Sequence, residues 1–167
     1  AHLCEHALYS GSANVAAGEH DRIVRSLGAE SNAFTRADYT LYYDDGFPSD
    51  ALEQVLALEA ERMRGIVFDR DAVLHERWRL EVEERGTHTG ETRRGAELDA
   101  LVFRSHPYGA GLLDERGHTR APRLEVADVR AFYDAWYHPD RAAVVVAGAI
   151  DPERALDAIE DAFEDLS

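Results

Sequence analysis

Apolar residues recur at helical spacing in several segments of the chain. In residues 68–84, a stripe with spacings of three and four residues predicts one face of a long helix. The same periodicity predicts helices over residues 19–27, from 49 or 50 to about 63, over 98–104, over 124–137 and from 151 onward. The stripe of the long helix is unusual because it mixes apolar and acidic side chains: Asp69, Val73, Glu76, Leu80 and Glu83.

Three segments instead have the composition of β-strands. Residues 31–35 and 38–43 predict two neighbouring strands with a turn at 36–38, and the first carries too few large apolar residues for a central position. Residues 142–148 form a short β-branched apolar run, which predicts a buried strand. Residues 85–95 are polar and rich in Gly and Thr, which predicts a loop or an irregular helix extension. The mixture indicates an α+β fold, with a mixed or antiparallel sheet packed with helices.

Composition limits the classes of function. The 167 residues are enough for one domain with a core, and 45% hydrophobic with 31% charged residues fits a soluble globular protein. The net charge of -15, with every one of the 18 basic residues an Arg, argues against nucleic acid and anionic membranes as partners. No run of 18 apolar residues predicts a membrane span. The compartment stays open, cytoplasmic or periplasmic if the source is bacterial.

The first six residues carry the candidate chemistry. His2 and His6 are four apart, so on a helix both imidazoles lie on one face within reach of one metal ion. Glu5 flanks that face and can take a proton from a metal-bound water. The order His-x-x-Glu-His is the inverse of the common zinc-protease signature. The alternative is a surface helix with two chance histidines.

A zinc site of this kind needs a third protein ligand. The candidates are His20, Asp69, His75, Glu76 and the remaining histidines, and mid-helix position on a partly apolar stripe favours Glu76. His75 points about 100° away around the helix and is expected at the surface. The single cysteine, Cys4, excludes an intramolecular disulfide and Cys-rich zinc sites. Its place on the helix predicts a buried apolar side chain rather than a ligand.

These motifs together resemble the pitrilysin–insulinase family of inverted-motif zinc peptidases, which includes the mitochondrial processing peptidases. The resemblance covers nearly the whole chain in order. It is carried by residues 1–6 followed by Gly11-Ser12, by Ser31-Asn32-Ala33-Phe34-Thr35, by residues 68–76, by His106-Pro107-Tyr108-Gly109, by Tyr137-His138-Pro139-Asp140 and by residues 144–148.

The resemblance implies a function and a set of site residues. It implies a zinc-dependent metalloendopeptidase in which His2, His6 and Glu76 hold one Zn²⁺ and Glu5 is the general base for the attacking water. In the family a further Glu precedes the ligand by seven residues. Asp69 stands at that position here, so the resemblance suggests that it supports the metal ligands. The family's edge strand pairs with the substrate backbone, which assigns peptide binding to Asn32, Ala33, Phe34 and Thr35.

The resemblance also implies that residues 1–167 are a single, partial zinc-peptidase domain. Family domains begin with strands upstream of the metal helix, and a second homologous domain or subunit closes over the site, so both are expected outside this chain. The rival functions are a non-catalytic subunit or scaffold of the same fold, an inactive fragment, and a helix-and-sheet domain without metal. A lyase of related fold, S-ribosylhomocysteine lyase, needs cysteines that this chain lacks.

Overall fold

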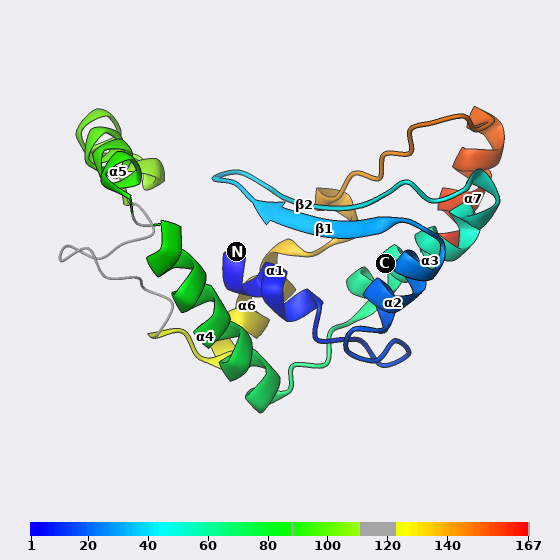
Figure 1. Cartoon of the computed structure of the whole chain (residues 1–167), viewed down its shortest axis with the longest axis horizontal. Helices are drawn as coiled ribbons and strands as arrows, with labels where there is room; N and C mark the ends of the chain where they lie inside the picture. Colours follow the sequence, from blue (N-terminus) through cyan, green and yellow to red (C-terminus); the bar gives the residue numbers. More distant parts are fainter. Residues whose placement is uncertain (88, 111–122, 167) are drawn as a thin grey trace.

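The fold places one short helix between a β-hairpin and two longer helices. The computed structural model describes residues 1–87, 89–110 and 123–166 (Figure 1). The elements follow one another as α1 (His2–Leu8), α2 (Glu19–Ser26), β1 (Glu30–Thr35), β2 (Thr40–Asp45), η1 (Ser49–Ala51), α3 (Leu52–Arg64), α4 (Arg70–Thr87), α5 (Gly90–Val102), η2 (Pro107–Ala110), α6 (Val126–Trp136), η4 (Pro139–Arg141) and α7 (Pro152–Phe163).

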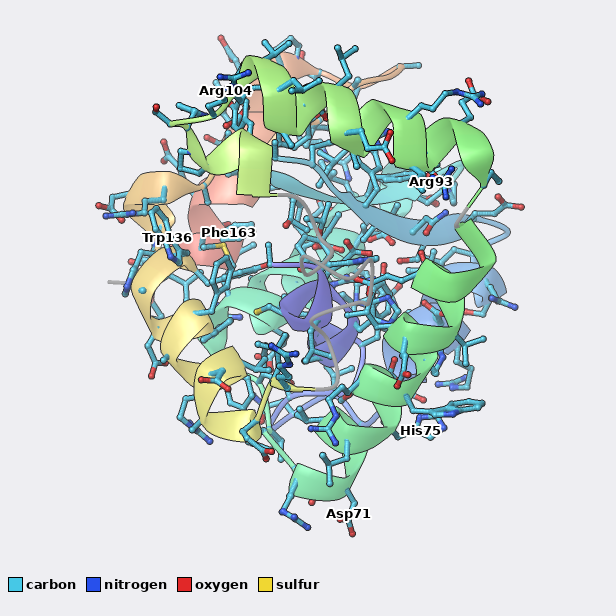
Figure 2. All side chains as sticks on the ribbon, turned by 90° about the vertical axis from the view of Figure 1, so that its left-hand side faces the viewer. Asp71, His75, Arg93, Arg104, Trp136 and Phe163 are labelled. Carbon is cyan, nitrogen blue, oxygen red and sulfur yellow. The ribbon has the colours of Figure 1, made fainter. Side chains whose placement is uncertain are left out.

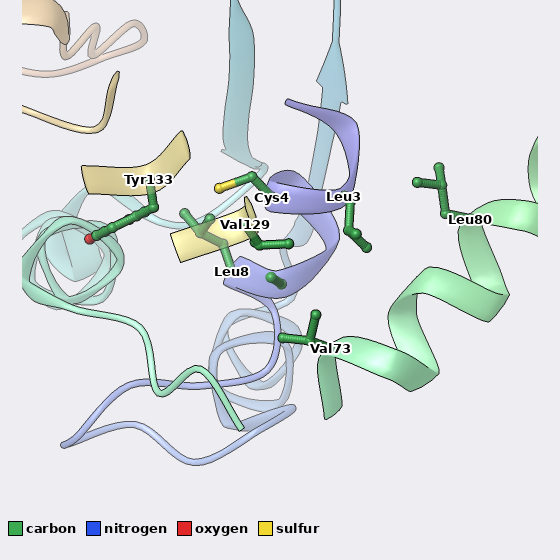
Figure 3. Close-up of a cluster of buried hydrophobic side chains, with 8 residues drawn as sticks. Leu3, Cys4, Leu8, Val73, Leu80, Val129 and Tyr133 are labelled. Carbon is green, nitrogen blue, oxygen red and sulfur yellow. The ribbon is translucent and has the colours of Figure 1, made fainter. Parts of the chain in front are cut away.

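Helix α1 is central because most of its side chains are apolar and buried. It lies under the hairpin, with α4 and α6 on its flanks (Figures 1 and 3). The cluster that joins these three helices consists of Leu3, Cys4, Ala7 and Leu8 of α1, Val73 and Leu80 of α4, and Val129 and Tyr133 of α6. The predicted apolar positions of α4 are therefore confirmed, and they fix α4 against α1. A second cluster joins α3 to α7 at the other end of the molecule.

The two strands form an antiparallel hairpin whose register runs from Glu30 opposite Asp45 to Thr35 opposite Thr40. This confirms the predicted pair of neighbouring strands. Within the described residues β1 pairs only with β2, so its other edge, on the side of α1, has no strand beside it. The α+β fold class is also confirmed.

Two predicted segments differ from the structure. Residues 142–148 form no strand within the described residues, and Val145 is 85% exposed. The prediction of a buried strand is wrong here because a β-branched apolar run favours extended backbone, whereas a strand also needs a paired neighbour. Residues 90–102 form the regular helix α5, where a loop or irregular extension was expected over 85–95. This helix begins at a capping box, in which the side chains of Thr89 and Thr92 each bond to the other residue's backbone N–H. No helix in the described ranges is both long and apolar enough to cross a membrane.

Candidate metal centre

Helix α1 brings the predicted pair of histidines and the acid between them together. Leu3, Cys4 and Leu8 of α1 pack into the core that α4 also joins, and the histidines of α1 contact Glu76 and Glu83 of that same helix. The rings of His2 and His6 are 5.0 Å apart between centroids, and one ligand atom each from His2, Glu5 and His6 all lie within 4.8 Å of one another. Glu5 is only 7% exposed, so its carboxylate is largely shielded from solvent.

Helix α4 supplies two carboxylates to these histidines, two turns apart. The Nδ1 atom of His6 lies 3.1 Å from Oε2 of Glu76, a hydrogen-bond distance. The Nε2 atoms of His6 and His2 lie 3.4 and 3.7 Å from the two carboxylate oxygens of Glu83. Glu76 and Glu83 therefore contact opposite sides of the His6 ring.

The arrangement fits a tetrahedral divalent cation. Because an ionised carboxylate only accepts hydrogen bonds, a neutral His6 that donates from Nδ1 to Glu76 would offer its Nε2 lone pair to a metal. Metal-bound histidines commonly use their second nitrogen in this way. Zinc bonds of about 2.1 Å place neighbouring tetrahedral ligand atoms roughly 3.4 Å apart. The Nε2-to-Glu83 separations match that spacing, so these atoms could hold one ion, whereas Glu76 contacts the other ring nitrogen of His6.

The electrostatic surroundings favour neutral imidazole. Burial, and next the neighbouring His6, lower the pKa of His2, which leaves a lone pair available for a metal near neutral pH. Arg79 holds Glu76 with contacts of 3.1 Å to both carboxylate oxygens. Burial raises the pKa of the Cys4 thiol to about 11, and Cys4 is 2% exposed in the core. Cys4 is thus the buried apolar residue that the sequence predicts.

Other candidates lie elsewhere. The Asp69 carboxylate accepts a hydrogen bond of 2.9 Å from the backbone N–H of Ala72 and so caps the start of α4. Its expected role in supporting the metal ligands stays a prediction. Figure 2 shows His75 and Asp71 on the outer side of α4, and the His75 side chain is 65% exposed, as expected for a surface residue.

The first strand approaches the centre from the hairpin. Asn32 and Ala33 line a cavity of about 510 Å³ that also touches Glu5, His6 and Glu83. The Thr35 hydroxyl donates to Oε2 of Glu5 across 2.5 Å. The Phe34 ring instead packs edge-on against Tyr39 and Tyr43. The backbone N–H of Ala33 donates to the Asn32 side chain across 2.8 Å.

Sequence reasoning passed over two features. The first is Glu83, which belongs to the predicted stripe of α4. It lies seven residues after Glu76, and the pitrilysin–insulinase family has two acids at this spacing, so this signal could have singled it out. The second feature is a cluster of His20, Asp44, Glu59 and Arg62. No spacing signals it, because its members come from α2, β2 and α3.

Comparison with known proteins places the chain among zinc-protease relatives. Residues 1–116 match the family described as Insulinase (Peptidase family M16), and residues 123–167 match the Peptidase M16 inactive domain. The chain is 30% identical to the zinc protease PqqE of Helicobacter pylori over 176 residues, which is 99% of this chain and 37% of that protein. It is 30% identical over 183 residues to the probable zinc protease PqqL of Escherichia coli, covering 99% of this chain and 18% of that one.

The same likeness holds in three dimensions. The crystal structure of the periplasmic protease PqqL from Escherichia coli matches 99% of this chain and 19% of that chain, with a TM-score of 0.85 at 24% identity. This match supports the fold. The chain thus spans well under half the length of these relatives.

Proposed function

The chain belongs to the insulinase family of peptidases (peptidase family M16), and on that premise we propose that it carries the zinc-binding site of a metalloendopeptidase. In this proposal His2, His6 and Glu83 hold one Zn²⁺, and Glu5 is the general base. The observation that carries it is the convergence of both Nε2 atoms on one carboxylate, beside a buried glutamate.

This ligand set replaces Glu76, the ligand expected from the sequence, with Glu83. The support is the use of the two ring nitrogens: Glu76 contacts Nδ1 of His6, while Glu83 faces Nε2 of both histidines. Glu76 then acts on the site by fixing the orientation and tautomer of His6. Arg79 in turn fixes Glu76.

The chain's own residues supply the proton transfers. When bound, the zinc ion polarises the water and the scissile carbonyl. Glu5 accepts the proton of the attacking water and returns it to the leaving amine. Its burial suits this role because a carboxylate with little bulk water around it keeps the proton at the site.

The substrate is a peptide segment laid along the free edge of β1. Exposed strand edges bind extended peptides by adding a strand, with main-chain hydrogen bonds to the edge. Asn32 and Ala33 line the cavity that reaches Glu5 and His6, so a peptide paired there passes the general base. Phe34 contributes its backbone, since its ring packs away on Tyr39 and Tyr43. The Asn32 side chain must release the Ala33 N–H for this pairing.

A second homologous domain or subunit closes the site in this proposal. The relatives named as zinc proteases are far longer than the chain. Activity therefore belongs to the full gene product, whereas zinc binding depends only on residues of α1 and α4.

The test is Glu5→Gln in the full gene product. The variant keeps the carboxylate's shape and cannot take a proton, so it should retain one zinc per chain while kcat/KM for a quenched-fluorescence peptide falls about 10²- to 10⁴-fold. Glu53→Gln is the matched control, because Glu53 is an exposed carboxylate paired with Arg154 on the far side of the fold.

Three results would contradict the proposal or part of it. A parent protein without bound zinc would refute the metal centre. A Glu5→Gln variant that cleaves as fast as the parent would refute the role of Glu5. Zinc in a parent with no turnover would favour the non-catalytic subunit of the same fold.

A further inference from the structure

One side-chain contact joins the strand assigned to the substrate to the acid assigned to proton transfer. Oγ1 of Thr35, the last residue of β1, lies 2.5 Å from Oε2 of Glu5 on α1. We propose that Thr35 is a positioning residue that holds the Glu5 carboxylate in its working orientation. This inference rests on the proposed function of Glu5 as the general base.

The direction of the hydrogen bond follows from the inventory of protons. In the ionised form that can accept a proton, Glu5 has only acceptor atoms, so the Thr35 hydroxyl must donate. A hydroxyl has one proton. The contact of 3.2 Å between the hydroxyls of Thr35 and Thr40 must then run from Thr40 to Thr35. The result is a directed chain from Thr40 through Thr35 to Glu5.

The carboxylate needs such a partner. The terminal torsion of a Glu side chain has broad preferences, so rotamer energetics alone do not fix the plane of the carboxylate. Glu5 is 7% exposed, and few solvent molecules are available to hold it. A donor on Oε2 sets that plane and leaves the other oxygen for the attacking water. Loss of the donor would also leave a buried charge short of a hydrogen bond.

The contact between Thr35 and Glu5 also links the position of a peptide along β1 to the orientation of the general base. Asn32 and Ala33 line the cavity, and Thr35 is three residues beyond Asn32 on the same strand, about 10 Å along it. A peptide that pairs with β1 is therefore placed relative to the same element that orients Glu5. Misplacement of a catalytic group by about 1 Å can cost roughly 10²-fold in rate. A single strand that positions both the peptide and Glu5 would limit such misplacement.

The experiment compares three variants of the full gene product. Thr35→Val keeps the shape and removes the hydroxyl; kcat for a peptide should fall about 10- to 100-fold, with KM within about threefold and zinc content unchanged. Thr35→Ser keeps the hydroxyl and should restore most of kcat. Thr40→Val removes the more distant donor and should lower kcat by less than about fivefold.

The outcomes separate this inference from the function beneath it. If Glu5→Gln is inactive and Thr35→Val is as active as its parent, Thr35 has no positioning role and the general base stands. If Thr35→Ser loses as much kcat as Thr35→Val, or if Thr35→Val raises KM instead of lowering kcat, the Thr35 hydroxyl does not position Glu5. If Glu5→Gln remains active, the proposed function itself fails. Should Thr35→Val not fold, the comparison of Thr35→Ala with Thr35→Ser decides the same question.

Discussion

Two clusters in this molecule combine histidine with carboxylates at similar distances. At the metal centre, His2 and His6 lie 3.4 to 3.7 Å from Glu83. In the second cluster, Nε2 of His20 lies 3.2 Å from Asp44 and 3.4 Å from Glu59. In each cluster three side chains, His2, Glu5 and His6 or His20, Asp44 and Glu59, bring one ligand atom each within 4.8 Å of one another, so both are candidate metal sites.

The second cluster differs from the metal centre because it already contains a positively charged side chain, the guanidinium of Arg62. Nη2 of Arg62 lies 2.8 Å from Nε2 of His20, which also lies 3.2 Å from Asp44, so the nitrogen that would coordinate a metal is already engaged. The carbon of the Arg62 guanidinium lies over the rings of Tyr9 and Tyr42, 4.7 and 5.1 Å from their centroids. Among the described contacts of His2 and His6 there is no arginine. We propose that this internal cation, rather than the set of ligands, decides which of the two clusters can bind a metal ion.

The metal centre gives the largest expected effect. Glu83→Ala removes a proposed zinc ligand. If that ligand contributes about a quarter of the zinc-binding free energy, the Kd for zinc should rise roughly 10³-fold. Glu76→Ala removes only the partner of His6 and should raise it about 10- to 100-fold. Competition with a fluorescent chelator measures both, and Asp71→Asn on the outer side of α4 is the control. The reverse order of effects would return the ligand role to Glu76.

Local patterns explain what the sequence could predict about this site. The spacing of His2, Glu5 and His6 within one helix determines their shared face, and the mixed stripe determines which face of α4 meets it. The choice between Glu76 and Glu83 depends on how far α4 is shifted along α1, which helical periodicity does not encode; the seven-residue spacing of the two acids is the one sequence signal that bears on it. Likewise, the apolar run at 142–148 predicted a buried strand, but its lack of a paired strand among the described residues could not be predicted.

Removal of the Arg62 guanidinium gives the next largest expected effect. Arg62→Met leaves Glu59, Asp44 and His20 buried or half-buried without their guanidinium, which should lower the free energy of unfolding in metal-free buffer by about 3 kcal/mol. The vacated His20 nitrogen can then take a metal, so zinc per chain should rise from one to two. Urea unfolding and metal analysis measure the two effects.

The control for that variant is Arg154→Met. Arg154 pairs with Glu53 at an exposed position, so its loss should change stability little and leave zinc at one per chain. If the parent already binds two zinc ions and His20→Asn loses one of them, the guanidinium does not exclude metal and the contrast between the clusters is wrong.

The smallest expected effect is a pH dependence confined to the second cluster. Burial raises the pKa of Glu59 to about 7 from its ordinary 4.5, despite the opposing charge of Arg62. Between these values the folded state binds more protons than the unfolded state, so the contribution of Glu59 to stability is present at pH 4.5 and is lost as pH rises toward 7. Glu59→Gln removes this titration. From pH 5 to pH 8 its free energy of unfolding should therefore fall less than the parent's, by about 1–2 kcal/mol after allowance for its partial exposure. Urea unfolding at three pH values measures the difference, and Glu53→Gln should follow the parent. Parallel curves for parent and Glu59→Gln would mean that the buried carboxyl stays ionised beside Arg62 across the whole range.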